Sequence, residues 1–240
     1  FRSNGRMNFD DLLNRLPEHV NRLICEGTTL SRNTKQRNEK EEDIETQMAG
    51  IMQTDAPVFV IAATTNMDRL VSVYNACRRT KRTLAMDVFQ ADMLDIAGNL
   101  PAPSSCKDMK VVQVGKPDHA HSELARYQAS KISRETLQRR RFTMLIRTSD
   151  PMIKFLDRMR RETLAEATLI FSMWHGYRKD ERTGKFIDYC MEKGMKVVVI
   201  HTSGHADRQA IQAVIDKVKP MEMIPVHTVN PQQLMKMSHQ

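Results

Sequence analysis

The 240-residue sequence has few cysteines, few aromatic side chains and no long apolar run. Its four cysteines stand far apart, without a Cys-x-x-Cys pair, so reduced buried thiols are favoured over disulfides or a zinc–thiolate site. No apolar run approaches the roughly 20 residues that a membrane-spanning helix needs, so we expect a cytoplasmic protein without a membrane partner. Aromatic residues make up only 5% of the chain, which leaves few rings on which nucleic-acid bases could stack.

Positive charge, by contrast, is in excess, with a formal net charge of +8 at pH 7. This excess favours an anionic partner, most simply RNA or DNA bound through its phosphates. Basic side chains gather at residues 78–82, 139–141 and 158–161. Each cluster alone is also typical of a solvated helix face, or of a helix C-terminus where Lys and Arg complement the helix dipole. We prefer that simpler interpretation for each single cluster.

Short apolar runs alternate with helical patterns along most of the chain. Strands are predicted at residues 22–26, 58–63, 83–88, 111–114, 142–147, 167–174, 197–200 and 221–226. Helices are predicted at residues 67–80, 91–97, 122–141 and 186–193, and a charged, solvent-facing helix within residues 33–53 is expected to cross between two sub-domains. This alternation predicts an α/β fold with a mostly parallel sheet flanked by helices.

Two apolar runs near the C-terminus each lead to a histidine. Residues 197–200 are followed by His201-Thr202-Ser203-Gly204-His205, and residues 221–226 are followed by His227. Open α/β sheets bind their ligands at the carboxyl ends of the strands. One histidine there is usually a hydrogen-bonded core residue, but recurrence at two strand ends favours a functional site.

The first of these segments suits a phosphate. Gly204 lets the backbone approach a ligand closely, and a helix opens just after His205, so the preceding amides face outward. The hydroxyls of Thr202 and Ser203 would add further donors, and His201 is placed in the same pocket. At the second strand end, neutral imidazole is a plausible zinc ligand.

Glu26 closes an earlier apolar strand, in Cys25-Glu26-Gly27-Thr28-Thr29. Three roles stay open for this carboxylate. It is a general acid or base, a partner that orients a histidine, or simply the first exposed residue after a strand.

Three segments, in this order, resemble the beta-CASP branch of the metallo-beta-lactamase superfamily: CEGTT at 25–29, SGHAD at 203–207 and PVHT at 225–228. That branch includes ribonuclease J-like enzymes, 3′-end processing nucleases and DNA-repair nucleases. Residues 57–89 also resemble the opening of its insertion domain. The resemblance implies a beta-CASP insertion at 34–189. Residues 1–33 and 190–240 would then form part of the metallo-beta-lactamase αββα fold, the latter segment being its C-terminal return.

The resemblance also implies a role for each matching residue. Glu26 matches the family's acidic motif and His205 the histidine beside the scissile phosphate, so both are assigned to catalysis. His227 matches the last zinc-ligand histidine of a site with two zinc ions. Substrate binding is assigned to His201, Thr202, Ser203 and Gly204. In the family, a metal-activated hydroxide attacks a phosphodiester bond.

The sequence departs from the family in lacking the HxHxDH ligand run and a later ligand histidine. It begins Phe1-Arg2, as though cut directly after the ligand Asp of a Gly-Asp-Phe-Arg segment. We therefore expect this chain alone to hold no complete zinc site and to be inactive. Exposed apolar surface from an incomplete αββα fold would favour a homo-oligomer.

The expected function is part of a zinc-dependent phosphodiester hydrolase, most simply a ribonuclease. One alternative is a non-catalytic module that binds nucleic acid or acts as a scaffold. Another is a metallo-hydrolase of small molecules. An HxHxDH run upstream of Phe1 would favour an enzyme over a scaffold.

Overall fold

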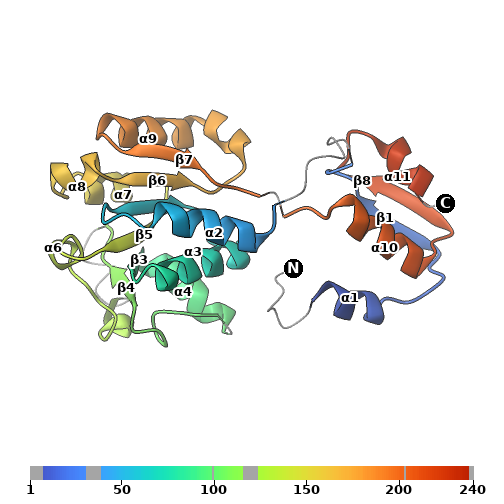
Figure 1. The fold of residues 1–240 in the computed structure, drawn as a ribbon, viewed down its shortest axis with the longest axis horizontal. Coiled ribbons are helices and arrows are strands. Elements are labelled where there is room, and N and C mark those ends of the chain that lie inside the picture. The colour runs from blue at the N-terminus through green and yellow to red at the C-terminus, as the bar shows by residue number, and fades with distance from the viewer. Residues whose placement is uncertain (1–7, 31–38, 99, 116–123, 203, 238–240) are drawn as a thin grey trace. The chain divides into compact units, whose positions relative to one another are not determined.

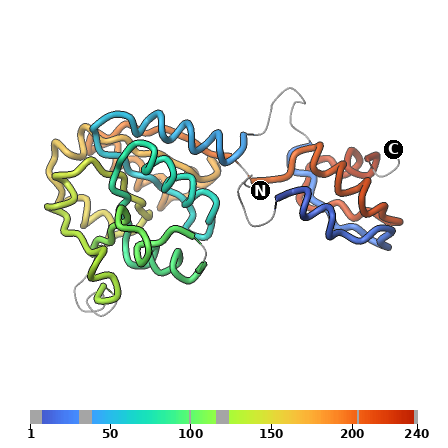
Figure 2. The backbone as a smooth tube through the Cα atoms, turned by 60° about the horizontal axis from the view of Figure 1, so that its bottom comes forward, coloured from blue at the N-terminus to red at the C-terminus, as the bar shows by residue number. Residues whose placement is uncertain are grey.

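The computed structural model describes residues 8–30, 39–98, 100–115, 124–202 and 204–237. The chain forms two compact units, one from residues 1–40 and 202–240 and one from residues 41–201. Both ends of the chain thus belong to the smaller unit, as the blue and red segments of Figure 2 show. Among the described helices, none is long and apolar enough to cross a membrane. All four cysteines are free, as expected.

The larger unit is built on a parallel sheet of six strands in the order β4-β3-β5-β2-β6-β7 (Figure 1). The strands are β2 (Val58–Ile61), β3 (Thr83–Asp87), β4 (Met109–Val112), β5 (Phe142–Ile146), β6 (Thr168–Phe171) and β7 (Lys196–Val199). Most of these strands are apolar on both faces, as a parallel sheet between helix layers requires. The predicted α/β class with a parallel sheet and flanking helices is confirmed.

Alternate strand residues supply two separate cores. Val58 and Val60 belong to one and Phe59 and Ile61 to the other. The first core is covered by α2 (Glu41–Ile51), α3 (Met67–Arg79) and α4 (Val88–Ala97). The second is covered by α7 (Asp150–Leu156), α8 (Arg161–Ala165) and α9 (Glu181–Glu192).

Two helices begin at side-chain caps. Asn66 Oδ1 accepts a hydrogen bond from the Arg69 amide at 3.1 Å, which caps α3. Ser149 Oγ accepts from the Met152 amide at 3.4 Å, with Pro151 in the first turn of α7. Both caps satisfy an amide that the helix itself leaves without a partner.

The predicted helix at 122–141 is wrong over residues 124–141, the part of it that the structure describes. The 3-10 turn η1 (Ala125–Tyr127) and the short helix α6 (Arg134–Leu137) stand there in place of one continuous helix. The Val111 amide donates to Ser130 O at 2.9 Å, and the Ile132 amide donates to Val111 O at 3.0 Å. The segment therefore bonds along β4, and that pairing replaces helical hydrogen bonds.

The helix expected within residues 33–53 exists as α2, although residues 31–38 lie outside the described part of the chain. It is not a solvent-facing crossing helix, because Ile44 and Met48 are fully buried in the larger unit. The sub-domain boundaries also differ from the expected 33/34 and 189/190. Strand β7 pairs with β6, so residues 190–201 belong to the larger unit.

The smaller unit pairs β1 (Arg22–Glu26) in parallel with β8 (Glu222–Val226). Its helices are α1 (Phe9–Arg15), α10 (Arg208–Val218) and α11 (Pro231–Met237). Ile211 and Ile215 of α10 pack with Leu234 of α11 and Met223 of β8 in a small core. Ile24 of β1 is 66% exposed, so this strand carries apolar surface that the unit does not cover. Self-association through such surface stays a prediction.

Candidate active site

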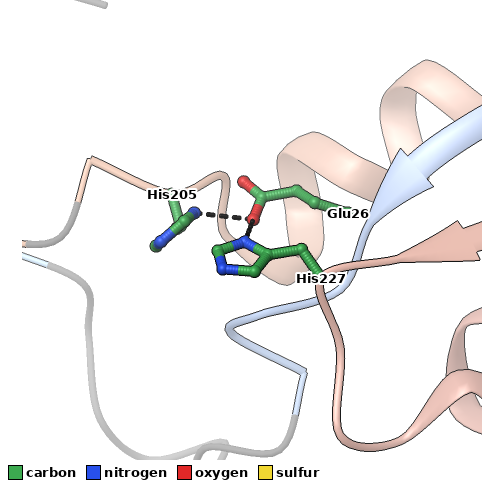
Figure 3. A group of neighbouring side chains, drawn as sticks. All are labelled: Glu26, His205 and His227. Atoms are coloured by element: carbon green, nitrogen blue, oxygen red, sulfur yellow. Dashed lines mark ion pairs between the residues drawn. The ribbon is translucent and has the colours of Figure 1, made fainter.

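The pairing of β1 with β8 brings two predicted site residues together. The strands are parallel and Glu26 lies opposite Val226, so both strands end at the same edge. His227 follows directly after β8, and His205 reaches the same place from the loop before α10. One ligand atom from each of Glu26, His205 and His227 lies within 4.8 Å of the others (Figure 3).

Glu26 and His205 form a hydrogen-bonded pair. His205 Nδ1 lies 2.6 Å from Glu26 Oε2, and each side chain is 28% exposed. An ionised carboxylate only accepts hydrogen bonds, so the shared proton belongs to Nδ1. The other ring nitrogen of His205, Nε2, points away from the carboxylate (Figure 3). This arrangement fixes the imidazole orientation and leaves Nε2 available for proton transfer.

Two further donors hold the Glu26 carboxylate. The Thr28 hydroxyl donates to Oε2 at 2.6 Å and the Ala206 amide donates to Oε1 at 3.2 Å. Burial by itself raises the pKa of Glu26. The hydrogen bonds from Thr28 and Ala206 and the positive charge of His205 outweigh burial and lower this pKa below its usual value. Glu26 is therefore ionised at neutral pH and suited to stabilising a protonated His205.

His227 is held differently. Its side chain is 69% exposed, and its Nδ1 lies 3.9 Å from Glu26 Oε2 and 3.1 Å from Thr28 Oγ1. The Thr28 hydroxyl has one proton, for which Glu26 Oε2 at 2.6 Å and His227 O at 2.9 Å are the acceptors, so the hydroxyl oxygen accepts from Nδ1 of His227. That tautomer leaves a lone pair on Nε2, the form in which imidazole binds a metal.

The backbone at His227 is strained, with φ at 49°. A side chain other than glycine in the left-handed region costs about 1–2 kcal/mol. Strain of this kind clusters at functional sites. The turn beside it is close-packed: a Cβ on Gly27 would meet Thr228 Oγ1 at 2.9 Å. Only glycine fits there without displacing Thr228.

Sequence reasoning gave no role to Thr28 and Thr29. Thr28 bridges Glu26 and His227, and the Thr29 hydroxyl donates to Ala206 O at 2.5 Å, which ties β1 to the loop that carries His205. The available signal was two consecutive hydroxyl residues just after an acidic strand end. Such hydroxyls bond neighbouring polar groups readily.

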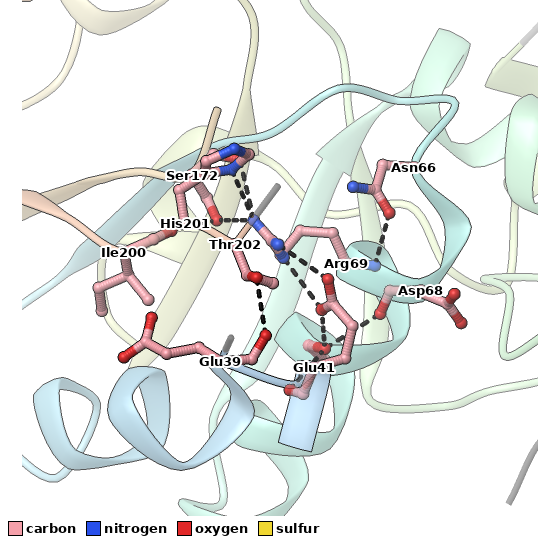
Figure 4. A network of polar contacts seen from close by, with 10 residues as sticks. Glu39, Glu41, Asn66, Asp68, Arg69, Ser172, Ile200, His201 and Thr202 are labelled. Atoms are coloured by element: carbon pink, nitrogen blue, oxygen red, sulfur yellow. Dashed lines mark hydrogen bonds and ion pairs between the residues drawn. The ribbon is translucent and has the colours of Figure 1, made fainter. Parts of the chain in front are cut away.

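The predicted substrate-binding residues have mixed outcomes. Gly204 adopts φ of 68°, and a Cβ there would meet nothing within 4 Å, so the backbone conformation rather than space favours glycine. Ser203 lies outside the described residues. Thr202 donates its hydroxyl proton to Glu39 O at 2.7 Å. His201 belongs to the larger unit, where its Nδ1 lies 3.5 Å from the guanidinium of Arg69 (Figure 4).

The donor set fits zinc only in part. A zinc site takes three or four protein ligands, and in the described residues Glu26, His205 and His227 form the group that could hold a metal. Nδ1 of His205 is bonded to Glu26 and cannot bind a metal while it carries that proton. His227, with an exposed Nε2, fits a zinc ligand. The Glu26–His205 pair instead fits proton transfer.

A comparison with protein families matches one segment of this geometry. Residues 191–234 match the Zn-dependent metallo-hydrolase RNA specificity domain. The matched segment includes β7, α10 and β8 and carries both His205 and His227. The match supports a likeness to zinc-dependent metallo-hydrolases of the metallo-beta-lactamase superfamily in this segment.

The fold also has a counterpart among solved structures. It is similar to the crystal structure of a protein of unknown function from Enterococcus faecalis V583, with a TM-score of 0.65 and 16% sequence identity. The alignment covers 94% of this chain and 50% of that protein, so this chain spans about half the length of its structural relative. At this identity the likeness shows the fold alone. Among curated proteins, no sequence matches the chain.

Proposed function

We propose that this chain is part of a zinc-dependent phosphodiester hydrolase of the beta-CASP branch that cleaves RNA in the cytoplasm. The observation that carries the proposal is the contact between Glu26 and His205, at 2.6 Å, with His227 beside it. Both histidines lie in the segment that matches the RNA specificity domain. The excess of positive charge suits an RNA substrate.

Each residue of the group has a distinct role in this proposal. His205 gives a proton from Nε2 to the oxygen that leaves when the phosphodiester bond breaks. Glu26 keeps Nδ1 protonated and stabilises the imidazolium form. His227 would hold zinc through Nε2, with Thr28 fixing its tautomer. Zinc, when bound, supplies an activated water and stabilises negative charge on the phosphate oxygens.

The experiment uses the complete gene product, purified with zinc, on RNA, DNA and ester substrates. We expect cleavage of RNA, and a loss of about 10²–10⁴-fold in His205→Ala with zinc content unchanged, the contribution typical of a general acid or base. His227→Ala is expected to lose zinc as well as activity. Glu222→Gln, at the other end of β8, is the control and should cleave like the wild type. Full activity in His205→Ala would refute its role.

A second candidate function is a non-catalytic module that binds nucleic acid. One observation favours it: the Glu26 carboxylate already accepts hydrogen bonds from Thr28, Ala206 and His205, which leaves two imidazole Nε2 atoms in this group of described residues, fewer than the three or four ligands of a zinc site. Zinc analysis of the complete gene product separates the two functions. A protein that binds RNA but neither holds zinc nor cleaves any substrate would be such a module.

A further inference from the structure

Two basic clusters that lie far apart in the sequence converge on one open cavity in the larger unit. The cavity has a volume of about 420 Å³. Its lining includes five basic residues and one acidic residue: Arg78, Lys81, Arg82, Lys107, Arg140 and Asp108. Each cluster alone is adequately explained as a solvated surface, but their convergence is a property of the fold.

Backbone hydrogen bonds fix the three segments that carry these side chains. The Thr83 amide donates to Arg141 O at 3.0 Å, and the Leu84 amide donates to Asp108 O at 3.1 Å. The cavity therefore lies where the adjacent strands β4, β3 and β5 begin (Figure 1). This edge is opposite to the carboxyl ends at which α/β sheets usually bind ligands.

The positive charge at the cavity is mostly uncompensated. Among the described residues, no carboxylate forms an ion pair with Arg78, Lys81, Lys107 or Arg140, whereas the neighbouring Arg79 pairs with Glu45. The carboxylate of Asp108 already accepts a hydrogen bond from the Tyr74 hydroxyl at 3.4 Å. The dipole of α3 accounts for Arg78 at its last turn, but Lys107 and Arg140 belong to other segments.

A buried guanidinium forms part of the same wall. Arg82 is 2% exposed and donates to the carbonyl oxygens of Met52 at 2.9 Å and Ala56 at 2.6 Å. Burial, together with the like charge of Arg141, lowers the pKa of Arg82 to about 10, so it remains charged at neutral pH. A buried cation is thus added to the exposed cations at the rim.

The lining and the open shape of the cavity indicate which ligand it could bind. No aromatic side chain lines the cavity, so bases have no ring to stack on. An open surface with cations spaced over three segments suits successive phosphates of a flexible strand. We propose that this cavity binds the phosphate backbone of single-stranded RNA, as a second contact in a different unit from the Glu26–His205 pair. The identity of the ligand rests on the proposed function.

The test is binding of a short, fluorescein-labelled uridine oligonucleotide to the full chain, measured by fluorescence anisotropy over a range of salt concentrations. Arg78→Gln/Arg140→Gln removes one cation from each cluster. Each lost phosphate contact makes the negative slope of log affinity against log salt concentration shallower by about 0.7 on a single strand. The slope of the double variant should therefore be shallower than that of the wild type by about 1.4. Binding to an adenosine oligonucleotide should weaken equally, because phosphates carry no sequence information. Arg78→Glu/Arg140→Glu should weaken binding further.

The control, Arg161→Gln/Lys196→Gln, removes the same charge from exposed positions elsewhere on this unit and should change the slope by much less. Equal affinity and slope in wild type and cavity variants would overturn the proposal and leave the proposed function standing. Calorimetric binding of tripolyphosphate that the cavity variant loses, with RNA affinity unchanged, would overturn RNA as the ligand. A wild-type chain that binds no RNA would overturn this site and the RNA specificity proposed above.

Discussion

Arg69→Met is expected to destabilise the larger unit by about 3 kcal/mol. The Arg69 side chain is fully buried and donates to both carboxylate oxygens of Glu41, at 2.8 and 3.0 Å (Figure 4). It also donates to the carbonyl and hydroxyl oxygens of Ser172, at 3.1 and 2.6 Å. Removing one partner of a buried ion pair typically costs about 3–5 kcal/mol, because the other charge loses its compensation. The Ser72 hydroxyl, 2.8 Å from Glu41, keeps the expected loss at the lower end.

The measurement is unfolding in urea, monitored by circular dichroism. Arg79→Met is a matched control, because Arg79 also links α3 to α2, through Glu45 at 3.6 Å, but its side chain is 52% exposed. Such a pair contributes about 0–1 kcal/mol. Arg69→Met/Glu41→Gln should recover part of the loss, since the carboxylate charge is then removed together with the guanidinium. A loss below about 1 kcal/mol in Arg69→Met would show that this network does not hold α2, α3 and the end of β6 together.

Three further predictions concern single positions. Gly27→Ala should destabilise the smaller unit by about 1–3 kcal/mol in thermal unfolding because of the contact with Thr228, whereas Gly50→Ala, in open space within α2, should stabilise the larger unit. His227→Gly should abolish zinc retention yet raise stability by about 1 kcal/mol, and a loss of stability would contradict the strain argument. Burial, with the charge of Arg69, lowers the pKa of His201 in the folded state. The free energy of unfolding of the wild type should therefore fall by up to about 1.4 kcal/mol per pH unit below about pH 6.5. His201→Asn should lack this dependence, and denaturant unfolding of both proteins at several pH values is the measurement.

The strands and their order along the chain were predictable because the parallel sheet is buried on both faces. Runs such as Val58–Ile61 leave few other structures for a short β-branched segment. The segment at 124–141 was not predictable in the same way. Its hydrogen bonds to Val111 join it to β4, which lies earlier in the chain, and a local sequence pattern does not show such a pairing. The pairing of β7 with β6 was not predictable for a related reason, since local pattern does not show which strands will be neighbours in a sheet.

At the candidate site, the residues and the family resemblance predicted both the side chains and their roles, which stay a prediction, but not the contacts between them. Glu26, His205 and His227 were each identified, and the structure brings all three together. Whether Glu26 orients a histidine or is simply exposed was left open, and its 2.6 Å contact with His205 favours the orienting role. His201, by contrast, bonds within the larger unit, because a histidine at a strand end is as readily held by a buried arginine as by a ligand.

The different positions of His205 and His227 explain why two strand-end histidines need not be equivalent. His205 is part-buried against a carboxylate that accepts its Nδ1 proton, so its ring is held in one orientation. His227 is mostly exposed, strained in its backbone and bonded to a hydroxyl through Nδ1, so its Nε2 is open to an external cation. A proton donor needs the first environment and a metal ligand needs the second. Exchange of the two roles would require Glu26 to lie closer to His227 than to His205, whereas Glu26 Oε2 lies 2.6 Å from Nδ1 of His205 and 3.9 Å from Nδ1 of His227.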